Sequence, residues 1–200
     1  MAANEGGQRR ASRFAGDGLT FHSMSYTFHL LPPRTDGDLR DYARLEMDDG
    51  AFVSVDPVKE AMKMRIAEAL VARYPDLEVS REGYGRDAPS RLRCFEINDL
   101  GEDSFGVQIQ LFDDEAMVSV PFWHTGEKAA ACFAQVWDLM RIVCGVAGYA
   151  VFDRQMDRAL ADGETYDAAL ATYTKSMMRV SRDPDLGGRK PAKPWWKKKR

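Results

Sequence analysis

Two clusters of carboxylates flank one expected strand, and such groups could serve acid/base catalysis, a divalent cation or a basic partner. The clusters are Asp99, Glu102 and Asp103, and Asp113, Asp114 and Glu115. A strand of about eight residues rises about 3.3 Å per residue, so the clusters should lie about 25 Å apart, near opposite ends of a sheet. That separation argues against paired catalytic carboxylates. Both clusters fit solvated turns, in which aspartate accepts backbone hydrogen bonds; in the functional alternative, a turn offers its carboxylates to Arg or Lys on a partner.

A cysteine and a histidine are the second candidate for chemistry, as nucleophile and base. Cys94 opens the first of three expected strands and His124 follows the third, so the two residues could lie on the same side of the sheet. A cleft near them and Tyr149 would make the protein a small enzyme. No neighbouring residue suggests an oxyanion hole or a group that orients the histidine, so packing for Cys94 and a turn role for His124 are preferred.

Aromatic residues mark two further candidate surfaces. Phe122, Trp123 and His124 stand in PFWHTG, between an expected strand and an expected helix, where aromatics can anchor a partner or pack in the core. In the C-terminal KPWWKKKR, Trp195 and Trp196 lie among basic residues. That tail could touch an anionic membrane transiently, dock as a peptide on another protein or be inert, and no amphipathic helix accompanies it for stable anchoring.

The sequence contains none of the common nucleotide-binding, zinc-protease or hydrolase motifs. GxGxxG, GxxxxGK[ST], HExxH and GxSxG are absent. The three histidines, His22, His29 and His124, are far apart, and the three cysteines, Cys94, Cys132 and Cys144, have no CxxC spacing. We therefore expect no metal and no cofactor, and we expect reduced thiols in a cytoplasmic protein.

Charge is divided unevenly between an acidic body and a basic tail. Residues 188–200 hold seven Lys or Arg and no acid, whereas residues 24–187 hold 18 basic and 29 acidic residues, a net charge of −11. An acidic body disfavours nucleic acid as a direct ligand and favours a basic protein partner. No apolar run in the sequence approaches the about 20 residues of a membrane span, and the N-terminus lacks the apolar segment of a secretory signal.

The residue patterns predict one α+β domain, with an antiparallel meander sheet and helices packed mainly on one face. We expect a disordered leader over 1–23, the domain over 24–182 and a flexible basic tail over 183–200. Apolar alternation and turn residues predict the following strands: 25–31, 77–80, 93–98, 105–112, 116–123 and 149–152. Caps and apolar stripes predict the following helices: 38–47, 57–74, one after Thr125 and one after Thr165.

Several segments in order resemble a family of small bacterial proteins. They are MSYTFHLLPP, EINDLG with GVQIQLFDDEAMVSVPFWHTG, GYAVFDRQ and PWWK, which together extend over most of residues 24–197. The resemblance brings no catalytic residue with it. Small acidic α+β proteins are similar in kind to immunity proteins that neutralise toxins. This likeness implies a non-enzymatic cytoplasmic protein whose acidic surface occludes a basic partner such as a toxin domain; a small enzyme and a tail-tethered accessory protein are the alternatives.

Overall fold

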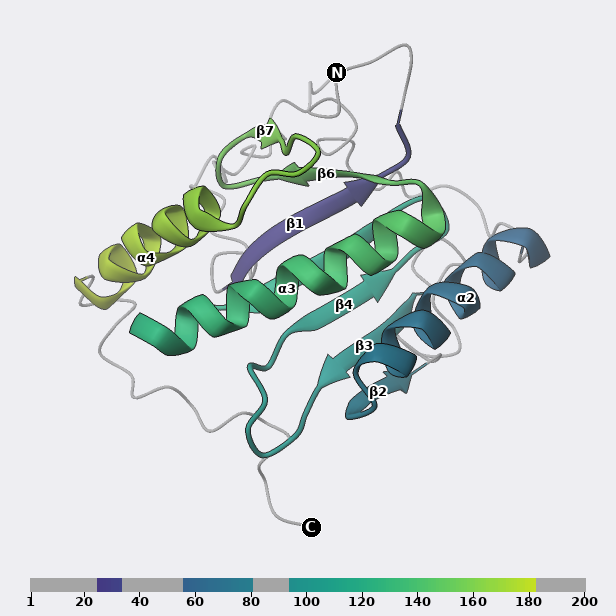
Figure 1. Ribbon diagram of the computed structural model, residues 1–200, viewed down its shortest axis with the longest axis horizontal. Helices are drawn as coiled ribbons and strands as arrows, with labels where there is room; N and C mark the ends of the chain where they lie inside the picture. The colour runs from purple at the N-terminus through teal and green to yellow at the C-terminus, as the bar shows by residue number, and fades with distance from the viewer. Residues whose placement is uncertain (1–24, 34–55, 81–93, 183–200) are drawn as a thin grey trace, which may run out of the picture.

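The computed structural model describes residues 25–33, 56–80 and 94–182, which form three helices and one sheet of seven strands (Figure 1). The strands are β1 (Ser25–Leu31), β2 (Leu77–Ser80), β3 (Phe95–Asp99), β4 (Gln108–Leu111), β5 (Ala116–Pro121), β6 (Ala150–Asp153) and β7 (Arg158–Ala159). The helices are α2 (Pro57–Arg73), α3 (Gly126–Ala147) and α4 (Asp167–Arg182). The leader, the helix expected over 38–47 and the basic tail with Trp195 and Trp196 lie outside the described residues.

The sheet is antiparallel, with the strand order β2-β3-β4-β5-β1-β6-β7. The meander expected from three strand-like runs is confirmed as β3, β4 and β5, and β2 extends it at one edge. Strand β1 departs from a meander, because it lies between β5 and β6, where Phe28 pairs with Val118 on one side and with Asp153 on the other. Six of the seven β1 residues are buried, which agrees with its central place in the sheet.

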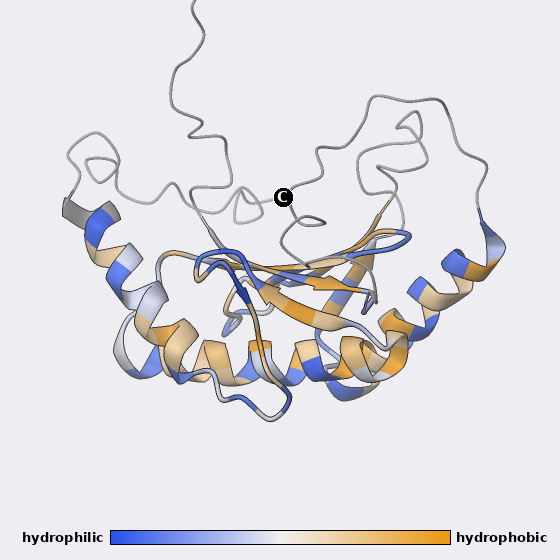
Figure 2. Ribbon diagram, turned by 90° about the horizontal axis from the view of Figure 1, so that it is seen from above, coloured by the Kyte–Doolittle hydropathy of each residue, from blue (hydrophilic) through white to orange (hydrophobic). Residues whose placement is uncertain are grey.

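All three helices cover one face of the sheet, as the view from above shows (Figure 2). Helix α3 runs across the middle strands, α2 lies over the β2 and β3 edge, and α4 lies on the β1 and β6 side (Figure 1). Sequence signals at the start of α2 are confirmed: Pro57 is its first residue, and Asp56 Oδ1 accepts a 2.9 Å bond from the Val58 amide. Thr125 precedes α3 but makes no side-chain capping bond.

Aromatic side chains form the centre of the core between sheet and helices. Tyr26 and Phe28 of β1 meet Phe133 of α3 and Tyr173 of α4, with the Tyr26 and Phe133 ring centroids 5.6 Å apart. By length and composition, α3 could cross a membrane, whereas no apolar run of that length was expected in the sequence. Its apolar stripe, which includes Phe133, faces the sheet instead, so α3 is the core helix of this domain.

Candidate functional site

The strand pairing places the two carboxylate clusters at opposite ends of the sheet. The turn that contains Asp113 and Asp114 joins β4 to β5 at one end, and the loop that contains Glu102 and Asp103 joins β3 to β4 at the other. The two clusters are therefore too far apart to share a catalytic role. Each cluster has a different chemical setting.

The carboxylates of the 113–115 turn are bonded to two lysines and one histidine of the same chain. Lys59 of α2 donates a 2.6 Å bond to Asp114. Lys63, one turn further along α2, donates a 2.9 Å bond to Asp113. Glu115 pairs with the imidazole of His29 on β1. The turn is thus fastened to α2 and β1, and its carboxylates already have partners.

Lys63 is the buried member of this group, with 2% of its surface exposed. Burial lowers the pKa of its ammonium group, but pairing with Glu60 and Asp113 raises that pKa by a larger amount, so the net shift is upward. The ammonium group also lies 5.4 Å from the centroid of the Phe95 ring. Lys63 therefore stays charged at the edge of the core, and this part of the molecule is a structural ion-pair group.

At the opposite end of the sheet, the first cluster lines a cavity of about 430 Å³ between α2, the start of β2 and the 99–104 loop. We call it the acidic cavity. The titratable residues in its lining are Arg73, Tyr74, Asp76, Asp99, Glu102 and Asp103. The side chains of Asp76, Glu102 and Asp103 are exposed. They make no ion pair with any other described residue.

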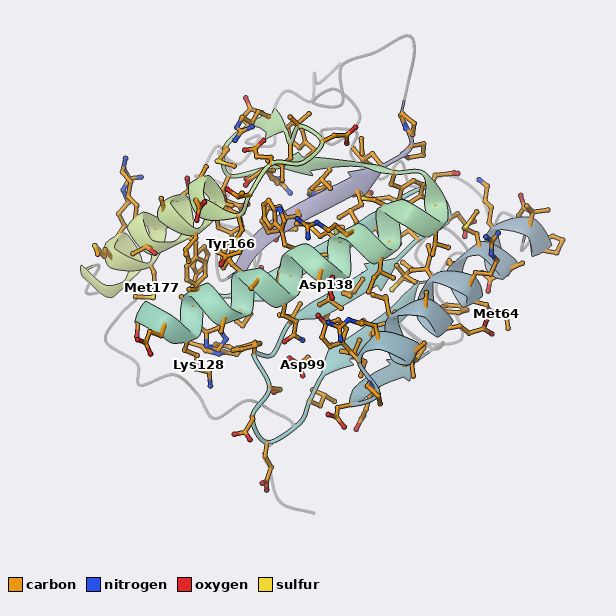
Figure 3. The ribbon with its side chains drawn as sticks, in the orientation of Figure 1. Met64, Asp99, Lys128, Asp138, Tyr166 and Met177 are labelled. Carbon is orange, nitrogen blue, oxygen red and sulfur yellow. The ribbon has the colours of Figure 1, made fainter. Side chains whose placement is uncertain are left out.

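The one basic residue in this lining, Arg73, is engaged elsewhere. Its Nε lies 3.2 Å from Asp138 Oδ2, and Asp138 also accepts a 2.7 Å bond from the Tyr74 hydroxyl. Asp138 therefore lies on the side of α3 that faces α2 (Figure 3). Burial raises the pKa of Tyr74 to about 12, and the Asp138 carboxylate adds to this rise. The acidic cavity is left with a surplus of negative charge.

Two side chains hold the loop that forms one wall of the acidic cavity. Asp99, at the end of β3 (Figure 3), accepts a 2.9 Å bond from the Phe105 amide. His124 Nε2–H donates a 2.6 Å bond to the Phe105 carbonyl, since a carbonyl can only accept. Burial lowers the pKa of His124, which keeps the imidazole neutral near pH 7. Asp99 and His124, both predicted partner-binding residues, thus position the loop from below the surface.

The aromatic residues of PFWHTG divide between core and surface. Phe122 is half-buried, and its ring stacks on Tyr173 with a centroid distance of 5.2 Å. Trp123 is 47% exposed, and its ring covers Gly106, where an added Cβ would lie 2.9 Å from the ring. Gly106 also has a φ of +68°, so both the backbone conformation and the lack of space for a Cβ favour glycine here. Of this motif, Trp123 is the large apolar side chain that a partner can reach.

The expectation that Cys94 and His124 share one side of the sheet is wrong. Cys94 precedes β3 at the end of the sheet where Leu111 of β4 lies, whereas His124 follows β5 at the end where Gln108 lies. In an antiparallel meander the first and third strands run in the same direction, so the third strand ends far from the start of the first. Cys94 is buried, and burial raises the pKa of its thiol to about 12, so little thiolate exists near pH 7. The pair cannot act as nucleophile and base. Tyr149 lines a different cavity, on the other side of α3.

Sequence reasoning missed Asp76 and the cavity itself. The cavity forms because Pro75 and Asp76 turn the chain from α2 into β2, and Leu77 then pairs with Asp99. Pro75 was the local signal for the end of the helix, but the pairing of β2 with β3 brings Asp76 to the acidic loop. Long-range pairing of this kind leaves no local pattern.

Among the described residues, no group of three or more His, Cys, Asp or Glu side chains converges as metal ligands would. Comparison of the chain with protein-family models, with curated protein sequences and with solved structures gave no match. The function is therefore argued from the geometry of the site.

Proposed function

We propose that this protein is a non-enzymatic binding protein whose acidic cavity accepts a basic side chain of a partner protein. A toxin domain that the protein occludes, as an immunity protein would, is the class of partner that fits best. The acidic cavity carries this proposal: Asp76, Glu102 and Asp103 border it without a basic partner among the described residues, and Arg73 is turned toward Asp138.

An arginine or lysine of the partner would complement this charge. Carboxylates grouped at a cavity favour guanidinium, which can bond two carboxylate oxygens in a fixed geometry. Trp123, on the segment that follows β5, adds an exposed aromatic ring. This ring contacts Gly106, which lies two residues after Ser104, a residue of the cavity lining. A basic side chain in a cavity beside an exposed tryptophan is a common composition for the centre of an interface.

The support of the loop favours binding without a large ordering cost. Asp99 bonds the Phe105 amide, His124 bonds the Phe105 carbonyl, and the His124 amide donates a 3.0 Å bond to the Tyr173 hydroxyl. The loop is therefore held from β3 and from the segment after β5, and α4 in turn holds that segment. A surface that is ordered before the partner arrives loses less conformational entropy on binding.

The second cluster has a smaller part in this proposal. Asp113, Asp114 and Glu115 contribute negative charge that can speed the encounter with a basic partner, but each is already bonded to Lys63, Lys59 or His29. The centre of the proposed partner surface is the acidic cavity with Trp123. A cytoplasmic location and a transient contact of Trp195 and Trp196 with anionic membranes stay predictions.

The test compares three baits in a pulldown from the native host, eluted with a salt gradient. The baits are the full chain, a triple variant with Asp76→Asn, Glu102→Gln and Asp103→Asn, and the control Glu68→Gln, which removes an exposed carboxylate on α2. We expect the full chain and Glu68→Gln to retain the same basic protein, and the triple variant to lose it. With the purified partner, the Kd of the triple variant should be at least about tenfold higher than that of the full chain.

Two further outcomes bear on the proposal. If the triple variant binds the partner as tightly as the full chain, the acidic cavity is not the interface. If the full chain converts the captured partner chemically, by cleavage or modification detected by mass spectrometry, the protein is an enzyme and the non-enzymatic assignment is wrong. Unfolding midpoints of all three baits within a few degrees of one another show that binding, not folding, was changed.

A further inference from the structure

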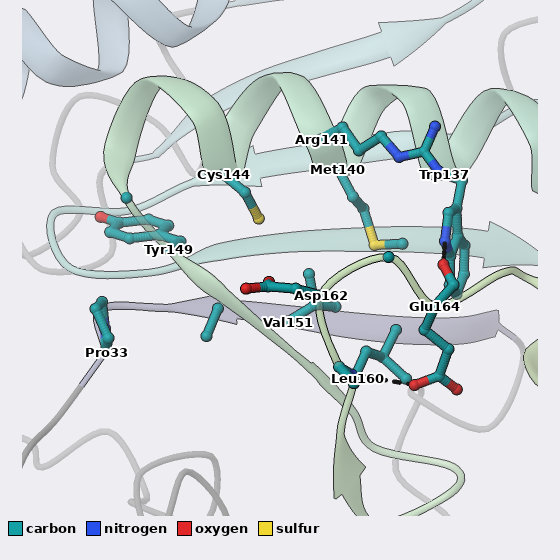
Figure 4. A pocket seen from close by; sticks show the side chains of 14 residues that line it. Pro33, Trp137, Met140, Arg141, Cys144, Tyr149, Val151, Leu160, Asp162 and Glu164 are labelled. Carbon is teal, nitrogen blue, oxygen red and sulfur yellow. Dashed lines mark hydrogen bonds between the residues drawn. The ribbon is translucent and has the colours of Figure 1, made fainter.

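A second cavity, of about 350 Å³, lies on the other side of α3 from the acidic cavity (Figure 4). It is open to solvent on one side and is lined by the C-terminal half of α3, the start of β6, the segment between β7 and α4, and Pro33 after β1. Its volume lies in the range of small-molecule sites, about 300–1,000 Å³. Trp137, Met140, Cys144, Tyr149 and Val151 form an apolar and aromatic part of its lining, and Arg141, Asp162 and Glu164 add charged groups. We call it the α3–β6 cavity.

Most polar groups at this cavity already have partners. The Trp137 indole Nε1–H donates a 2.8 Å bond to the Glu164 carbonyl. The Glu164 carboxylate accepts a 2.9 Å bond from Arg158 and a 3.1 Å bond from the Ala161 amide. Arg158 and Ala161 hold the pKa of Glu164 below its usual range. Glu164 therefore supports the wall and has little charge to offer a ligand.

Asp162 differs from these groups. Its carboxylate extends into the α3–β6 cavity toward Tyr149, below Cys144 (Figure 4). It makes no ion pair or hydrogen bond with another described residue. Arg141, also in the lining, extends along α3 in the direction of Trp137 and forms no ion pair with Asp162. The charge that faces the interior of the cavity is thus negative.

We propose that the α3–β6 cavity binds a small organic cation with an apolar body, whose ammonium group pairs with Asp162. An apolar body fits against Met140 and Val151, and the Tyr149 ring offers an aromatic wall near the charge. A carboxylate combined with aromatic and aliphatic walls suits an amine ligand with an apolar body. This inference is independent of the proposed protein interface, because the two cavities share no lining residue.

Cys144 supplies a built-in reporter for the α3–β6 cavity. Its thiol is partly exposed in the wall, whereas Cys94 and Cys132, the other cysteines of the chain, are buried. Burial raises the pKa of the Cys144 thiol to about 11, and the Asp162 charge contributes to the rise. Alkylation of Cys144 is therefore slow, and a ligand in the cavity should slow it further by blocking access.

The experiment uses three probes of similar shape and different charge: 2-phenylethylamine, 2-phenylethanol and phenylacetate. We expect the amine to bind with a Kd of about 1 mM or tighter, and the alcohol and the acid at least about tenfold more weakly. Binding is measured by the shift of the Trp137 indole N–H signal, assigned with Trp137→Phe. Saturating amine should also lower the rate of Cys144 alkylation by N-ethylmaleimide at least about threefold, read by mass spectrometry.

Asp162→Asn should lower the affinity for the amine at least about tenfold, whereas Glu68→Gln on α2 should leave it unchanged. Because Asp162 is exposed and unpaired among the described residues, its variant should keep the unfolding midpoint of the wild type. Equal binding of all three probes, a preference for phenylacetate that Arg141→Gln abolishes, or no binding of any probe would overturn the assignment. Equal amine affinity in Asp162→Asn would do the same.

Discussion

The His124 imidazole donates a 2.6 Å hydrogen bond to the Phe105 carbonyl and thereby ties the segment after β5 to the acidic loop between β3 and β4. Asp99 bonds the amide of the same residue, so Phe105 is held at both of its backbone groups. His124 is 3% exposed and Asp99 is 7% exposed. Two residues that sequence reasoning assigned to a partner surface instead fix the geometry of that surface.

The first prediction concerns pH. Because burial lowers the pKa of His124 in the folded state, protonation favours the unfolded state. The free energy of unfolding should therefore fall as the pH drops from about 6.5, the pKa of an unfolded histidine, through the lower pKa of His124 in the folded protein. His124→Phe lacks this titration and has no side-chain donor. At pH 7.5 the variant should be less stable by about 1–3 kcal/mol, since the Phe105 carbonyl loses its donor, and this gap should narrow below pH 6.5.

Urea titrations of both proteins at several pH values give the difference in unfolding free energy. Other titrating groups cancel in that difference, including Asp153, whose pKa burial raises. A gap that stays constant from pH 7.5 to pH 5 would show that His124 does not titrate in this way.

The second prediction separates the two aspartates of the 113–115 turn. Asp113→Asn should destabilise the protein by about 1–3 kcal/mol, because it removes one of the two carboxylates that neutralise buried Lys63. Asp114→Asn should cost less than about 1 kcal/mol, since solvent reaches both side chains of this pair, with 35% of Lys59 and 54% of Asp114 exposed. Chemical denaturation measures both changes. Equal losses in the two variants would contradict the distinction between a buried and an exposed pair.

Local signals in the sequence predicted much of the fold. Asp56 and Pro57 predicted the start of α2, and the alternation of apolar and polar residues predicted β3, β4 and β5. These signals are local, since caps and turns act over a few residues. The position of β1 between β5 and β6 was not predicted, because it depends on pairs such as Phe28 with Val118, which are far apart in the chain. The number of antiparallel strands between Cys94 and His124 already required them to lie at opposite ends.

The candidate site was predicted only in part. Residue types made Glu102, Asp103 and Trp123 candidates for partner binding, with core packing as the alternative for Trp123, and the structure places them around the acidic cavity or beside its loop. Residue types could not show that α2 brings Lys59 and Lys63 onto the other acidic turn. That match depends on how α2 packs over the sheet, which no local pattern encodes.

The third prediction concerns Gly106, where φ is +68° and an added Cβ would meet the Trp123 ring at 2.9 Å. Gly106→Ala should destabilise the protein by about 1–3 kcal/mol and displace the Trp123 ring, which a change in tryptophan fluorescence would report. Gly126→Ala is the matched control, because φ is +53° there and nothing lies within 4 Å of the added Cβ. A smaller loss in Gly106→Ala than in Gly126→Ala would mean that the Trp123 contact adds no constraint.

The last prediction tests whether any thiol of this protein is activated. Burial raises the pKa of Cys94 and Cys132 to about 12 and that of Cys144 to about 11. At pH 8, iodoacetamide should therefore modify Cys144 about two orders of magnitude more slowly than free cysteine, because the thiolate fraction is smaller by that factor. Cys94 and Cys132 should react only after unfolding, since both are buried. Peptide mass spectrometry of timed samples identifies the order, and a Cys94 that reacted faster than free cysteine would restore the nucleophilic role that its burial and its distance from His124 argue against.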